Sequence, residues 1–67
     1  MSPTDPFKEV KTLFGTLDDL NQERRKCYTD WGTGKISPSD FGARMIENLR
    51  RTHEAAAAME KLLSREE

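Results

Sequence analysis

Basic and aromatic side chains are concentrated in the middle of the sequence, where they have the chemistry to hold an anion. Residues 21–53 contain seven Lys and Arg against four Asp and Glu, whereas residues 1–20 and 54–67 each carry a net charge of −2. Guanidinium groups donate paired hydrogen bonds to phosphate oxygens, and aromatic rings stack on nucleobases. One hypothesis is therefore capture of a nucleotide or a nucleic-acid phosphate. The candidate anion-binding residues are Arg24, Arg25, Lys26, Arg50, Arg51, Tyr28 and Trp31.

The same charge distribution has two other interpretations. In a chain folded back near its middle, the positive segment forms one tip and the two negative segments form the open end. Such charges are typical of an ordinary solvated helix surface. They also fit self-assembly in which the tip of one molecule lies beside the open end of another. The sequence alone leaves these alternatives open.

The chain has one histidine and one cysteine, and neither is placed for catalysis. His53 would need a nucleophile or a carboxylate beside it, and the adjacent Glu54 points about 100° away on a helix. Cys27 is expected nearer the other end of the folded chain, as a small core residue. No phosphate loop, carboxylate pair or metal-ligand spacing is present either, so we expect no enzyme, no cofactor and no metal. A single cysteine also excludes an internal disulfide and favours a reducing cytoplasm.

The glycine-rich stretch at residues 29–41 resembles the loop of an EF-hand calcium site. Gly34 stands at the sixth loop position, Ile36 at the eighth and Asp40 at the twelfth. Calcium also requires oxygen ligands at positions one, three and five, and the third position here is Trp31, which has no oxygen ligand to offer. We therefore predict a glycine turn followed by a capped helix.

Apolar residues spaced three and four apart predict two helices. The first is expected from about residue 5 to 29 and the second from about 38 to 64, joined by a turn at about 30–37. Ser37 is expected to cap the second helix. Pro38 is expected as its first residue, because proline lacks the N–H that the first helical turn leaves unsatisfied.

The short connection predicts an all-α fold, an antiparallel hairpin of two long helices. Folding the chain about its glycines pairs residues whose numbers add up to about 67, which places Cys27 opposite Phe41. Tyr28 and Trp31 are then expected to gather with Phe41 near the turn.

The register predicted from the sequence also places Leu13 and Phe14 opposite the alanine run at residues 55–58. Large side chains that face small ones allow two helix axes to approach closely, which supports this register. Ala56 is accordingly expected to face the first helix.

The apolar stripes are broader than one shared seam requires, which predicts that two hairpins dimerise into a four-helix bundle. A stable monomer, with a third contact made by the N-terminal segment, is the alternative. The expected interface residues are Val10, Phe14, Leu17, Met45, Ile46, Leu49, Ala56, Met59 and Leu63.

Arg24 interrupts the first apolar stripe and is the most informative single residue. Its stem can pack near Met45 while its head reaches solvent or a carboxylate such as that of Glu47. A polar residue in a helical seam can fix register or oligomer number, and we favour this role for Arg24 over ligand binding. Asn21 is a second candidate for it.

Composition limits the class of protein. The 67 residues suffice for one domain, and 34% hydrophobic and 34% charged residues with a net charge of −1 exclude a polybasic protein and a membrane span. We expect a small non-catalytic cytoplasmic protein, such as an adaptor, inhibitor or regulator of bacterial or phage type. Its partners would be a second copy of itself and another protein. The rival hypotheses are the anion-binding protein and a structural subunit of a larger assembly.

Overall fold

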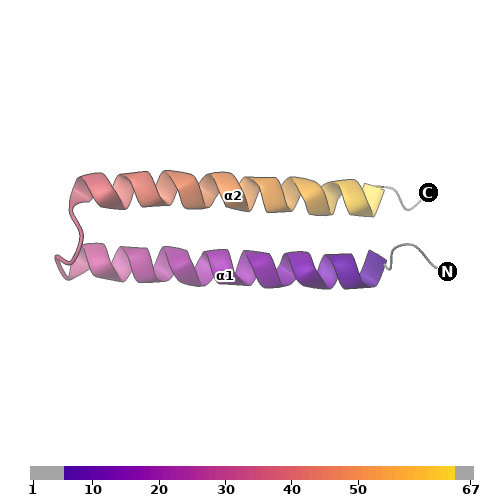
Figure 1. Cartoon of the computed structure of the whole chain (residues 1–67), viewed down its shortest axis with the longest axis horizontal. Helices are drawn as coiled ribbons and strands as arrows, with labels where there is room; N and C mark the ends of the chain where they lie inside the picture. The colour runs from indigo at the N-terminus through magenta and orange to yellow at the C-terminus, as the bar shows by residue number, and fades with distance from the viewer. Residues whose placement is uncertain (1–5, 65–67) are drawn as a thin grey trace.

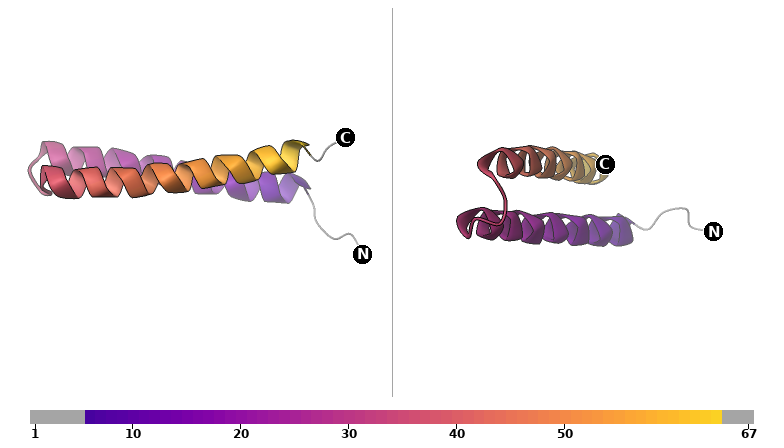
Figure 2. Two further views of the ribbon diagram at one scale, coloured as in Figure 1. Left: turned by 90° about the horizontal axis from the view of Figure 1, so that it is seen from above. Right: turned by 60° about the vertical axis from the view of Figure 1, so that its left-hand side comes forward.

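The computed structural model describes residues 6–64, which form two antiparallel helices side by side (Figure 1). Helix α1 spans Pro6–Gly32 and helix α2 spans Pro38–Ser64, each with 27 residues. The molecule measures 51 × 15 × 14 Å, and the helices cross at a shallow angle when seen from above (Figure 2). The predicted all-α hairpin is thus confirmed. The expected helix start at residue 5 and the last three residues lie outside the described range.

Helix α1 ends in a Schellman motif centred on Gly34. The Lys35 N–H donates to the Asp30 carbonyl at 2.8 Å, and the Gly34 N–H donates to the Trp31 carbonyl at 3.1 Å. This bonding pattern requires a left-handed residue, and Gly34 has a φ of 80°. The helix therefore continues to Gly32, instead of ending at residue 29 as the sequence suggested.

Helix α2 begins with a side-chain cap. The Ser37 hydroxyl oxygen accepts a hydrogen bond of 3.1 Å from the Asp40 N–H, which satisfies one of the free donors of the first turn. Pro38 is the first helical residue, as predicted.

The helices pack along one seam of residues spaced alternately three and four apart. The Trp31 and Phe41 rings stack at 4.4 Å between centroids, and Arg24 bonds to Asn48. Two residues that lie opposite each other across the seam, which we call a level pair, therefore have numbers that add up to 72. The predicted sum of about 67, with Cys27 opposite Phe41, was wrong. The reason is the later end of α1, which moves the turn toward the C-terminus.

The corrected register also changes which alanine is buried. Ala55 is 7% exposed and belongs to the seam, whereas Ala56 is exposed. The prediction that Ala56 faces α1 was wrong, because one residue corresponds to a rotation of about 100° on a helix. Leu13 borders surface grooves together with Ala55 and Ala58, so the proximity of Leu13 to the alanine run is confirmed.

Candidate functional site

A polar cluster occupies the seam on the tip side of its centre. The Arg24 Nη1 donates to Asn48 Oδ1 at 2.7 Å and to Thr52 Oγ1 at 2.9 Å. The Asn48 amide Nδ2 in turn donates to the Leu20 carbonyl at 2.9 Å, across the two helices. Asn48 is only 2% exposed, so these bonds satisfy groups that are removed from water.

Arg24 bonds to neutral side chains, so the carboxylate of Glu47, one of the two environments expected for its head, is not its partner. Its Nη2 also donates to Asn21 Oδ1 at 3.3 Å. The hydrogen bonds are directional and reach from one helix to the other, so a shift of one residue would break them. Thr52 was noted in the sequence as a polar residue on the second apolar stripe, but neither Thr52 nor Asn48 was predicted to be a partner of Arg24. Their position in the seam, three and seven residues after Met45, was the signal that could have found them.

The two C-terminal arginines of the candidate anion site are engaged by carboxylates of their own helix. Arg50 donates to Glu47 at 2.7 Å and to Glu54 at 2.8 Å, and the Arg51 Nε donates to Glu47 at 3.2 Å. The hydrogen bond from Arg50 is the main reason that the pKa of the Glu47 carboxyl lies below its ordinary value of 4.5. Glu47 in turn raises the pKa of Arg50.

The structure does not bring the seven anion-binding candidates to one place. Arg24 bonds within the seam and lines one pocket together with Lys26, which pairs with Asp30 at 3.7 Å, whereas Arg51 lines a different groove. Arg25 is exposed one helical step beyond Arg24, so it points to another side of α1.

The three aromatic residues near the turn do gather, as predicted. Trp31 stacks on Phe41, and its ring centroid lies 6.3 Å from that of Tyr28. Tyr28 nevertheless remains 64% exposed, so the cluster covers the surface of the tip and does not form a core.

One side of the hairpin carries most of the large exposed apolar side chains. In α1, Phe14 and Tyr28 are fourteen residues apart, and in α2 Leu49, Ala56 and Leu63 follow one another at intervals of seven. Seven residues make nearly two helical turns, so each series lies along one line of its helix. Each series also comes one residue after seam residues, and in antiparallel helices that step turns both series toward the same side.

We call this side the apolar face. Phe14 is 56% exposed, Ile46 70%, Leu49 51% and Leu63 56%. Of the other expected interface residues, Val10, Leu17, Met45 and Met59 are half-buried at the border between this face and the seam. The apolar face consists of Phe14, Tyr28, Ile46, Leu49, Ala56 and Leu63.

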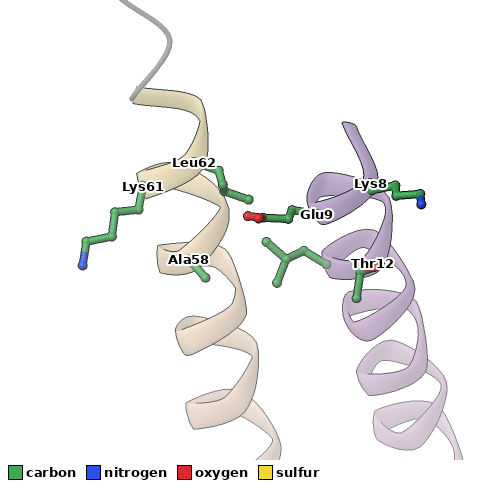
Figure 3. A pocket seen from close by; sticks show the side chains of 7 residues that line it. Lys8, Glu9, Thr12, Ala58, Lys61 and Leu62 are labelled. Carbon is green, nitrogen blue, oxygen red and sulfur yellow. The ribbon is translucent and has the colours of Figure 1, made fainter. Parts of the chain in front are cut away.

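The opposite side, which we call the charged face, carries polar groups around shallow apolar grooves. Figure 3 shows the groove near the open end, where Glu9 and Leu62 point toward one another while Lys8 and Lys61 extend outward. A second groove continues toward the tip. The charged face consists of Thr12, Thr16, Glu23, Lys26, Arg44, Arg51, Glu54 and Ala58.

The remaining candidate groups stand apart from one another. His53 is exposed, and the Cys27 thiol is free and buried in the seam. Within residues 6–64 no three His, Cys, Asp or Glu side chains are grouped so that they could hold a metal ion. Neither described helix combines the length and the apolar character that crossing a membrane demands.

No protein-family model matches the sequence, and no curated protein or solved structure is significantly similar to it. The fold defines the class, a two-helix antiparallel hairpin with one apolar and one charged face.

Proposed function

We propose that this chain is a small non-catalytic interaction protein that acts as a homodimer, with two apolar faces packed together in a four-helix bundle. The observation that supports this is the collection of large exposed apolar side chains on one side. Contiguous apolar patches on small proteins mark interaction sites, whereas single exposed apolar residues do not.

The small core of one hairpin supports the same proposal. Of the described side chains only five are buried, namely those of Leu20, Cys27, Asn48, Ala55 and Leu62. A chain of 67 residues with a single cysteine, and so without an internal disulfide, is marginally stable unless it packs very regularly or associates. Burial of the apolar face would supply the hydrophobic contacts that the seam alone lacks.

The apolar face draws on both helices of a hairpin that is 51 Å long and 15 Å wide. Standard stable interfaces bury about 800 Å² per partner, which pairing along the length of this face would have to supply. Pairing through the apolar face would leave the charged faces outward on both sides of the bundle, and we assign these to the second partner, another protein.

Replacing one alanine on each face of α2 by glutamate tests the homodimer. Ala56 lies on the apolar face and Ala58 on the charged face of the same helix. We expect Ala56→Glu to raise the dimer Kd by at least about 30-fold, because an unpaired carboxylate in an apolar interface costs about 2 kcal/mol or more. Ala58→Glu should leave the Kd within about threefold of the parent.

Sedimentation equilibrium over a range of concentrations measures both constants, with circular dichroism reporting helix content at each concentration. A parent chain that stays monomeric at all concentrations would contradict the proposal. Equal dimerisation of the Ala56→Glu and Ala58→Glu variants would contradict the choice of face.

A further inference from the structure

We propose that the second copy packs with its tip beside the tip of the first, so that α1 of each hairpin lies against α2 of the other. This inference rests on the proposed homodimer and specifies its geometry. The two copies would be related by a two-fold axis parallel to the helices, and the interface would be isologous, with the same patch contributed by both.

The two-fold axis fixes which residues meet. Rotation about an axis parallel to the helices does not move any residue along them. A residue of α1 therefore lies level with the same α2 position in its own hairpin and in the second copy. Within the hairpin, the Trp31–Phe41 stack and the Arg24–Asn48 hydrogen bond define the level pairs. The register between copies follows from the register within one.

Side-chain size is complementary at two levels of this register. On the apolar face α1 carries the large residues Phe14 and Tyr28, whereas α2 presents Ala56 and Gly42 at nearly the same levels. A ring on α1 of either copy would enter the hollow beside Ala56 or Gly42 of the other. Large residues facing small ones let helices approach closely and fill the space between them.

Charge is complementary along the edge of the apolar face. Lys11, Asp18 and Arg25 border the face on α1, and Glu60, His53 and Ile46 lie along the matching edge of α2. Lys11 of each copy lies level with Glu60 of the other, which has the opposite charge, and Asp18 lies level with His53, whose imidazole N–H can donate a hydrogen bond to it. All four side chains are exposed, and within residues 6–64 none of them takes part in an ion pair.

The opposite packing, with tip beside open end, lacks both kinds of match. It places α1 against α1 of the second copy, and full overlap of the helices brings Lys11 near Arg25 and Asp18 near Asp18 of the second copy. Like charges that face each other directly are destabilising.

The net charges of residues 1–20, 21–53 and 54–67 favour the packing of tip beside open end. Most basic residues of the tip, however, point away from the apolar face. Lys26, Arg44 and Arg51 line grooves of the charged face, and Arg24 bonds within the seam. Charges separated by more than about 10 Å are largely screened at moderate salt, so the edge residues decide the orientation.

Reversing the charge of Lys11 or Glu60 tests whether these two residues pair between copies. We expect Lys11→Glu alone and Glu60→Lys alone each to raise the dimer Kd about tenfold at low salt, because each homodimer then holds two like-charged pairs. An equimolar mixture should form heterodimers with a Kd near that of the parent, since both pairs are restored. In the opposite packing the mixture gains nothing, and Lys11→Glu relieves its repulsion with Arg25 and strengthens the dimer.

A distance measurement then reads the orientation directly. Lys35→Cys in a Cys27→Ala background places one spin label on the turn of each copy. Pulsed electron resonance should give a distance of about 20–30 Å for adjacent tips, set by the width of the bundle. Tip beside open end separates the labels by about 40 Å, the length of a 27-residue helix.

Dimers with the long distance would overturn the inference while the homodimer stands. The absence of any dimer in the parent chain would overturn the homodimer itself. The Lys11 and Glu60 variants need no change at Cys27, so they decide the question if the labelled variant fails to fold.

Discussion

The two halves of the seam are held together by different chemistry. Toward the tip, Arg24, Asn48 and Thr52 form a hydrogen-bonded cluster between the helices. Toward the open end, the seam consists of apolar contacts around Ala55 and Leu62. Apolar burial is non-directional and tolerates small shifts, whereas hydrogen bonds are made only in one geometry. The tip half therefore specifies the register, and the open-end half contributes burial.

The largest effect is expected from breaking the polar half. Asn48→Ala removes the acceptor of Arg24 and the donor to Leu20, and leaves a guanidinium in the seam without its main partner. We expect a loss of about 2–4 kcal/mol in the free energy of unfolding. Urea denaturation followed by circular dichroism measures it.

The matched control replaces both partners. The double variant Arg24→Leu with Asn48→Leu leaves no unpaired group in the seam, and its stability should equal or exceed that of the parent. If Asn48→Ala were as stable as the parent, the polar cluster would have no role in holding the helices together.

The open-end half is expected to respond to size. Ala55 is buried where the helices approach, so Ala55→Leu should overpack the seam and cost about 1–3 kcal/mol. Ala57→Leu adds the same side chain at an exposed position of the same helix and should change stability by less than about 0.5 kcal/mol. Thermal unfolding compares the two, and equal melting temperatures would mean that the alanines do not set the helix separation.

The smallest effect concerns the exposed ion pairs beside the polar cluster. The pKa of Glu47 is lowered in the folded chain, so its contribution to stability is complete above the ordinary value of 4.5 and is lost as the pH falls through the lowered pKa. Glu47→Gln should reduce the fall in melting temperature between about pH 6 and pH 3.

The polar cluster of Arg24, Asn48 and Thr52 contains no carboxyl group, so Glu47→Gln separates the two polar contributions. An unchanged acid profile in this variant would show that other carboxylates, and not the Arg50 pair, govern acid unfolding.

Elements that depend on local chemistry could be predicted from the sequence. Spacings of three and four gave both helices, and the small polar residue before Pro38 gave the start of α2. The end of α1 was misplaced because Gly32, Thr33 and Gly34 offer several places for a helix to end, and only the hydrogen bonds that the Gly34 and Lys35 N–H groups donate select one.

Features that depend on the register could not be predicted in the same way. Each apolar stripe is wider than the seam, so hydrophobicity alone does not decide whether Ala55 or Ala56 faces the other helix. An error of a few residues in the predicted position of the turn is enough to place Ala56 in the seam instead of Ala55. Arg24 stood out as a polar residue among apolar ones. Asn48 did not stand out, because the register must be known before Arg24 can be recognised as its partner.

The reactivity of the Cys27 thiol reports how often the two helices separate transiently. Its sulfur is buried between the helices on the tip side of the molecule, five residues before the last residue of α1. A reagent reaches that sulfur only while the helices are apart. The rate at which a thiol reagent modifies Cys27 therefore measures the opening of the native hairpin, without any label or substitution.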